Sequence, residues 1–132
     1  ANLGGNAGSQ SLTVVVRGLA LGELEFASRW KAILKEVSVG FCTGLINGLL
    51  MALIAYIWYG NFWLSLILFV AMIANMLLAG LFGAVVPLLL NWADKDPALG
   101  SHILVTTVTD VGGFFNFLGL ATTLMGRLNI PL

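Results

Sequence analysis

Asp110 is the residue of this sequence best suited to cation chemistry. It is the only charged residue in the apolar stretch 102–125. An aspartate near the centre of a membrane helix costs about 2.5–3.5 kcal/mol on insertion scales, so something must offset that cost. A cation in a water-filled path would do so, and Thr106 and Gly113, one turn to either side, give the same helix face a small and polar character. The alternative is a structural ion pair with Arg17 inside a helix bundle.

A second group of polar residues lies near the amino terminus and repeats at helical spacing. One face of this segment carries Asn6, Gln10, Thr13 and Arg17, with Gly5 and Ser9 beside it. Amide and hydroxyl oxygens suit a hard cation or the waters around it. They suit hydrogen bonds between membrane helices equally well. The residue types therefore do not favour either cation binding or helix packing.

Two further carboxylates, Asp94 and Asp96, precede the stretch that holds Asp110. Asp96-Pro97 is typical of a turn, or of a helix N-cap with proline at the first helical position. Carboxylates at a pore mouth could also gather cations. His102 is expected to be an interfacial or capping residue, and Cys42 to be small apolar filler. The sequence contains no nucleophile–base pair and no phosphate loop, so it does not indicate an enzyme.

The elements that must position these residues are membrane helices. The chain is 59% hydrophobic and only 9% charged, whereas soluble domains carry roughly 25% charged residues. Its zero net charge offers no basic patch for nucleic acid. Three apolar stretches are long enough to cross a bilayer core of about 30 Å, and a weaker, more polar candidate could be sheltered inside a bundle. We therefore expect an all-α membrane protein with a bundle of about four transmembrane helices, at about 5–21, 38–59, 62–92 and 102–126.

The segment 23–37 has a different pattern, with apolar residues at helical spacing and charges between them. This predicts an amphipathic helix lying at the membrane interface. The segment holds three of the six basic residues, so the positive-inside rule places it in the cytoplasm and Gly60 outside. We expect a multi-pass protein of the plasma (inner) membrane.

Small residues at a spacing of four predict where helices approach closely. Two overlapping GxxxG units are formed by Gly40, Gly44 and Gly48, and the next helix carries Ala71, Asn75, Ala79 and Gly83. We interpret both faces as packing surfaces, across which Asn47 and Asn75 could form hydrogen bonds.

The two ends of the chain resemble the MgtE magnesium channels and the related eukaryotic solute carrier family 41. GGNAGSQSLTVVVRGLALGELE resembles their second transmembrane helix, with its GGNxGxQ signature and VRGLAxGE ending. DPALGSHILVTTVTDVGGFFNFLGLAT resembles their last helix, with DPA followed by a TxxD run. The middle of the chain is similar only in hydropathy and in helix count.

This resemblance implies a homodimer with five transmembrane helices per subunit and a pore on the dimer axis, lined by the second and fifth helices. Residues 1–132 would be an integral membrane fragment holding helices two to five, without the first helix and without the cytoplasmic gating domains. The resemblance places the central Mg²⁺ site at Asp110, a position near the cytoplasmic mouth at Asp96, and a position beside the pore at Asn6. The neighbouring pore-lining positions would be Gly5, Ser9, Gln10, Thr13, Thr106 and Gly113.

The function expected on these grounds is transmembrane transport of divalent cations, with Mg²⁺ as the transported ion. Mg²⁺ holds its water tightly, and proteins bind it through one or two carboxylates and several retained waters. Two alternatives remain open: a transporter of another divalent cation such as Co²⁺ or Mn²⁺, and a non-conducting membrane subunit in which Asp110 and Arg17 serve assembly.

Overall fold

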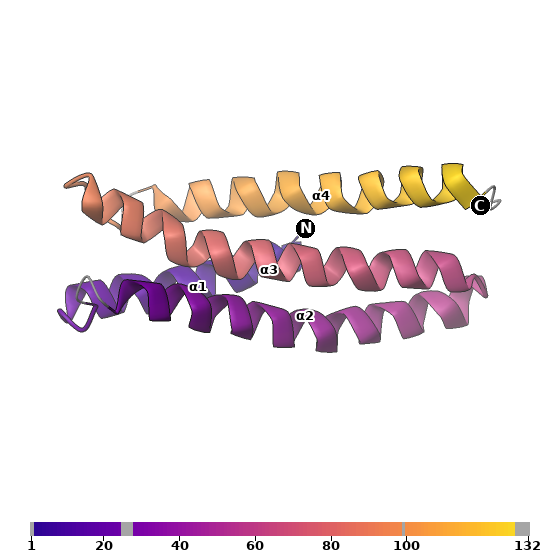
Figure 1. The fold of residues 1–132 in the computed structure, drawn as a ribbon, viewed down its shortest axis with the longest axis horizontal. Helices are drawn as coiled ribbons and strands as arrows, with labels where there is room; N and C mark the ends of the chain where they lie inside the picture. Colours follow the sequence, from indigo (N-terminus) through magenta and orange to yellow (C-terminus); the bar gives the residue numbers. More distant parts are fainter. Residues whose placement is uncertain (1, 25–27, 99, 129–132) are drawn as a thin grey trace.

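The fold is a bundle of α-helices in which one long helix contacts all the others (Figure 1). The computed structural model describes residues 2–24, 28–98 and 100–128. Over these residues the helices are α1 (Asn2–Ala20), α2 (Arg29–Tyr59), α3 (Phe62–Trp92) and α4 (Ser101–Leu128). Helix α3 packs against α1, α2 and α4, and α1 also packs against α4, whereas α1 and α2 scarcely touch. The all-α fold with four helices is confirmed.

Three of the helices are long and apolar enough to cross a membrane. They are α2, α3 and the portion Ser101–Leu124 of α4. Their outward surfaces carry many exposed large apolar side chains, such as Ile57 at 76% and Phe115 at 77% exposure. The hydrocarbon tails of lipids neither donate nor accept hydrogen bonds, so they can cover such apolar surfaces. Helix α1 does not meet the same criteria, and its first residues lie about halfway along the bundle (Figure 1).

The turn between α2 and α3 is built from Gly60 and Asn61. Gly60 has a φ of 64° and its N–H donates to the carbonyl of Tyr56, which closes α2. The side-chain oxygen of Asn61 then accepts hydrogen bonds from the backbone N–H groups of Trp63 and Leu64, at 3.0 and 3.2 Å. These bonds satisfy donors that the first turn of a helix leaves without a partner. Local chemistry therefore fixes this hairpin.

The structure differs from the expected separate surface helix over 23–37. Residues 25–27 lie outside the described residues, and Arg29 begins a helix of 31 residues that runs through Val37 into the span. The Ser38 hydroxyl donates to the Leu34 carbonyl at 2.7 Å, within that same helix. No glycine or proline interrupts the chain at this point. A helix of this length reaches about 46 Å, more than the bilayer core of about 30 Å, so its charged first turns can project beyond it.

The glycines of α2 bring its backbone against α3. A Cβ added at Gly44 would lie 3.0 Å from the Cα of Ile73, and one added at Gly48 would lie 3.1 Å from the carbonyl oxygen of Phe69. The four-residue repeat on α3 does not meet this surface. Its member Gly83 faces the Gly8 carbonyl on α1 instead. Helix α3 therefore packs against the glycines of α2 with a face that carries Phe69 and Ile73, and it turns Gly83 toward α1.

Candidate cation site

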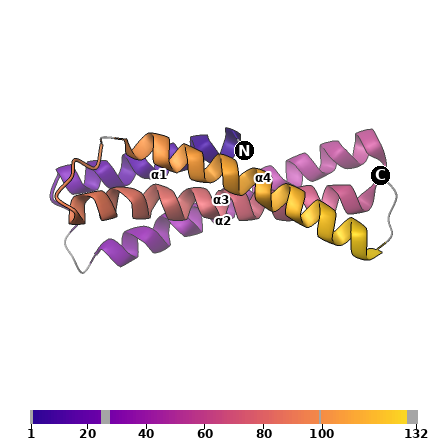
Figure 2. The same cartoon turned by 90° about the horizontal axis from the view of Figure 1, so that it is seen from above.

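Helices α1 and α4 run antiparallel and form a polar seam at the end of the bundle where α1 ends and α4 begins (Figure 2). A Cβ added at Gly5 would lie 3.7 Å from the Thr106 methyl carbon and 3.7 Å from the Thr109 hydroxyl oxygen. One turn along α1, the Ser9 hydroxyl oxygen lies 3.0 Å from Nδ1 of His102. These contacts set the register of the seam.

Asp110 lies at the level of the first turns of α1. Its neighbour Thr109 is buried against Gly5, whereas Asp110 itself is exposed. Asn6, the residue after Gly5, is exposed as well. The structure therefore brings the two residues to the same level of the bundle, on helices that pack together, and leaves both side chains uncovered by the described residues of this chain.

Arg17 does not lie at that level. From Gly5 to Arg17 the helix advances about 18 Å along its axis, away from the level of Asp110. An arginine side chain cannot span that distance, so the two residues do not pair within one chain. The structural ion pair considered as an alternative for Asp110 is not formed here.

The remaining polar residues of the seam divide into exposed and buried positions. Gln10 and Thr13 are exposed and Thr106 is partly exposed. The Thr13 hydroxyl donates to the Ser9 carbonyl at 2.8 Å, and the Thr106 hydroxyl donates to the His102 carbonyl at 2.9 Å. Because each hydroxyl proton is used inside its own helix, each oxygen is left as an acceptor that suits a hydrated cation.

Two glycines expected at the pore are buried between helices. Gly5 is covered by α4, and Gly113 faces Asn75 of α3, whose side-chain oxygen would lie 3.0 Å from a Cβ added there. They allow close helix packing in this chain and do not lie on its surface. They therefore set the spacing of the helices that carry the polar side chains.

Asp96 lies in the loop before α4 and shapes a turn. Its Oδ1 accepts a hydrogen bond from the N–H of Ala98 at 2.9 Å. Helix α4 begins at Ser101, so Asp96 is a turn residue and not the helix N-cap. Its carboxylate is exposed and lies beyond the His102 end of the seam, away from Asp110.

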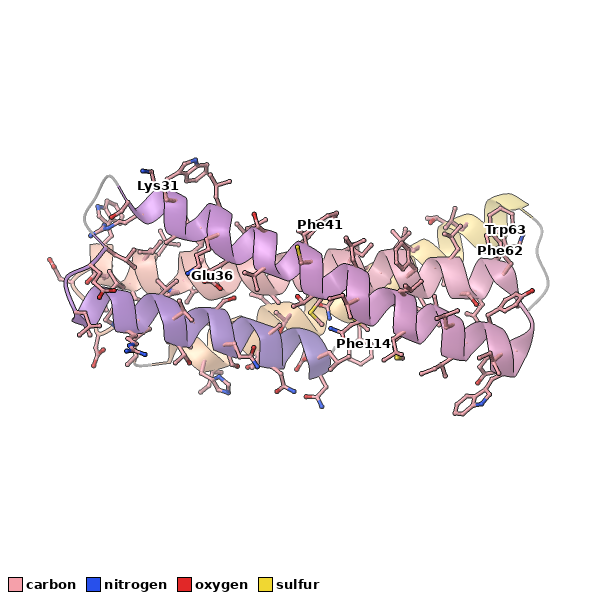
Figure 3. All side chains as sticks on the ribbon, turned by 90° about the horizontal axis from the view of Figure 1, so that it is seen from below. Lys31, Glu36, Phe41, Phe62, Trp63 and Phe114 are labelled. Carbon is pink, nitrogen blue, oxygen red and sulfur yellow. The ribbon has the colours of Figure 1, made fainter. Side chains whose placement is uncertain are left out.

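Two buried polar residues were not assigned to the candidate site from the sequence. Asn75 is 4% exposed and lies between Gly4 and Gly113, and its Oδ1 has no hydrogen-bond partner among the described residues. Glu36 is 5% exposed and turns toward α1 (Figure 3), where it lines a cavity of about 250 Å³ with Gln10. The four-residue repeat gave a signal for Asn75, whereas the amphipathic pattern placed Glu36 on a solvated face.

The chemistry available at the seam is that of a hydrated ion. Among the described residues, no three His, Cys, Asp or Glu side chains come together to hold a metal ion. A single carboxylate with nearby amide and hydroxyl oxygens can still hold Mg²⁺ through its retained water shell. Such a weak, open arrangement is compatible with an ion that must also leave.

Comparisons with known proteins agree with this chemistry. Residues 1–120 match the MgtE family, described as "Divalent cation transporter". The chain is 37% identical over 122 residues to the magnesium transporter MgtE of Thermus thermophilus, and 33% identical over 121 residues to that of Enterococcus faecalis. It is 30% identical over 124 residues to that of Bacillus subtilis. These alignments cover 92%, 92% and 94% of this chain but only 27%, 27% and 28% of the relatives, so the chain spans about a quarter of their length.

Proposed function

The chain belongs to the MgtE family of divalent cation transporters, and from this premise we propose that its α1–α4 seam lines a pathway for Mg²⁺. The observation that carries the proposal is the position of Asp110. It is an exposed carboxylate, and it is the only Asp, Glu, Lys or Arg in the candidate span Ser101–Leu124. Arg17, the one charged residue of α1, is out of its reach. A cation that passes along the seam offsets the cost of placing this carboxylate in the membrane.

The proposed pathway is completed by a second copy of the chain. Asp110, Asn6 and Gln10 are all uncovered in one copy, and lipid would be a poor environment for them. If two copies face each other across the seam, two carboxylates and two sets of amide oxygens surround one water-filled path. This arrangement suits Mg²⁺, which is bound through one or two carboxylates and several waters.

The charges of the bundle indicate its orientation in the membrane. Arg17, Lys31, Lys35 and Lys95 come from the segments that meet where α1 ends, α2 begins and α3 ends. The turn at Gly60, at the opposite end, carries no charge. The positive-inside rule therefore puts the His102 end of the seam in the cytoplasm. We propose that the protein lies in the plasma membrane, with Asp96 at the cytoplasmic mouth.

Mg²⁺ uptake into liposomes tests this proposal. The full-length protein that contains this chain is reconstituted, and the initial rate is followed with a Mg²⁺-sensitive dye. Asp110→Asn removes a charge-assisted interaction worth about 1.5–3 kcal/mol, so uptake should fall about ten- to a hundredfold. A rate within twofold of wild type would contradict the proposal.

The matched control is Asp94→Asn. Asp94 is an exposed loop carboxylate with a φ of 53°, a conformation that asparagine also tolerates. The Asp94→Asn variant should take up Mg²⁺ at the wild-type rate. Repeating the assay with Co²⁺ and Mn²⁺ tests selectivity, because octahedral oxygen sites do not separate Mg²⁺ from Mn²⁺ sharply.

A further inference from the structure

Glu36 is a buried carboxylate that the proposed Mg²⁺ pathway does not use. It is 5% exposed, and it lies on the side of α2 that turns toward α1 (Figure 3). No hydrogen bond or ion pair joins its carboxylate to another residue in the described part of the chain. A buried charge without a partner is destabilising, so a cationic group bound beside Glu36 would stabilise this part of the bundle.

Glu36 lies where two cavities meet between α1 and α2. The cavities have volumes of about 300 and 250 Å³, and Val14, Lys35 and Glu36 line both of them. They form a cleft because α1 and α2 scarcely touch each other. Apolar side chains, such as Ala32 in one cavity and Val39 in the other, form part of its walls. Val14 is 50% exposed, so the cleft is accessible from the side of the bundle, where lipid lies.

The cleft lies at the depth of the lipid headgroups. The part of α2 after Glu36 contains no charged residue up to Tyr59, and it reaches about 34 Å at 1.5 Å per residue. This run covers a bilayer core of about 30 Å, so Glu36 lies at the edge of that core. Lys31 and Lys35 come before Glu36 on the same helix, further from the core, at the end of the bundle that its charges place in the cytoplasm.

The charges around the cleft determine which headgroup fits it. Lys31 and Lys35 line it, but so do the carboxylates of Glu23 and Glu36. Basic pockets between membrane helices on the cytoplasmic side bind anionic headgroups, whereas here two carboxylates would repel one. A zwitterionic phospholipid matches both signs, because its phosphate can pair with the lysines and its positive group with Glu36. The long lysine stems allow their ammonium groups to reach a phosphate at the surface.

The groups beside Glu36 distinguish an ammonium headgroup from a choline headgroup. Gln10, Ser11 and Thr43 line the same cavity as Glu36, and their oxygens can accept hydrogen bonds. A primary ammonium group has three N–H donors for these oxygens and for the carboxylate. The trimethylammonium group of choline has none and is bound by aromatic cages. Among the described residues, no aromatic side chain lines either cavity.

We propose that the α1–α2 cleft binds phosphatidylethanolamine. Its ammonium group forms hydrogen bonds with Glu36, its phosphate pairs with Lys31 and Lys35, and an acyl chain lies along Val14 and Val39. The bound lipid joins two helices that scarcely touch without it. The proposal concerns the cleft between α1 and α2, and it does not require that the seam between α1 and α4 conduct Mg²⁺.

Native mass spectrometry of the full-length protein tests this proposal. Delipidated protein in detergent is titrated with three dioleoyl phospholipids that differ only in their headgroups: phosphatidylethanolamine, phosphatidylcholine and phosphatidylglycerol. The most tightly bound phosphatidylethanolamine should bind about tenfold more tightly than either of the others, as a hydrogen bond to a charged group provides.

Two variants identify the residue that recognises the headgroup. Glu36→Gln keeps the size of the side chain, and it should weaken phosphatidylethanolamine binding about tenfold while leaving phosphatidylcholine binding unchanged. The matched control is Asp94→Asn, which changes an exposed loop carboxylate that does not line the cleft. This control should bind phosphatidylethanolamine as the wild type does.

Three results would overturn the inference. Equal binding of phosphatidylethanolamine and phosphatidylcholine to the wild type would show that the cleft does not recognise the ammonium group, and this comparison needs no folded variant. A preference for phosphatidylethanolamine that persists in Glu36→Gln would show that the lipid binds elsewhere. Tightest binding of phosphatidylglycerol would show that the lysines alone select the headgroup. Lipid binding is measured without transport, so a failure of the proposed Mg²⁺ pathway leaves this result interpretable.

Discussion

Gly83→Ala should push α1 away from α3 and destabilise the bundle. A Cβ at position 83 would lie 2.6 Å from the Gly8 carbonyl oxygen and 2.7 Å from the Ser11 Cβ. Ordinary contacts begin at 3.4 Å, so α1 must move by about 0.8 Å. The neighbours are backbone and Cβ atoms, which cannot rotate away. Overpacking of this kind costs about 1–3 kcal/mol, and the displaced helix carries Asn6 and Ser9 of the seam.

The control for this substitution is Gly112→Ala on α4. Its added Cβ would lie 2.9 Å from a single atom, Cδ1 of Leu78, which is the end of a flexible side chain. SDS-induced unfolding followed by tryptophan fluorescence compares the two variants in the full-length protein, and Mg²⁺ uptake is measured in parallel. Gly83→Ala should unfold at lower SDS and transport more slowly than Gly112→Ala. If the two variants behave alike, the close approach of α1 and α3 does not support the seam.

The same unfolding assay tests two asparagine side chains, Asn75, which is buried, and Asn61, which caps α3. Asn75→Asp should destabilise the protein by at least about 3 kcal/mol, because it places an unpaired carboxylate between Gly4 and Gly113. Asn75→Leu, which removes the unsatisfied oxygen, is its control and should cost less than half as much. Asn61→Ala should cost about 1 kcal/mol through loss of the α3 cap, with Mg²⁺ uptake unchanged; an unaltered unfolding midpoint would show that the cap contributes nothing.

The α2–α3 hairpin could be predicted from the sequence because local chemistry determines it. Gly60 and Asn61 separate two uncharged runs, and each residue forms the cap that its type favours. The start of α2 could not be predicted in this way. Its amphipathic first turns fit either a surface helix or an extension of the span. Packing decides between them, since a Cβ at Gly80 would meet the carbonyl of Glu36, which ties these turns to α3.

The residue types of the candidate site could be predicted from the sequence, but the register of α1 against α4 could not. Periodicity puts Asn6 and Gln10 on one helix face and Thr106 and Asp110 on another, yet it does not say which residues meet. That depends on α3, whose Asn75 lies between Gly4 and Gly113 and so fixes how the ends of α1 and α4 overlap. Because α3 aligns α1 with α4, neither the spacing of residues in α1 nor that in α4 reveals which of their residues meet.

Register also decides what can neutralise Asp110. By residue type alone, Arg17 is a suitable partner, and a pair inside the bundle would give a structural role to both. The contacts of Gly5 with Thr106 and of Ser9 with His102 place Arg17 about 18 Å further along α1. The carboxylate is thus left without the countercharge that its membrane position demands. In the transport function proposed above a mobile cation supplies that charge, which is why the packing of α1 against α4 bears directly on the proposal.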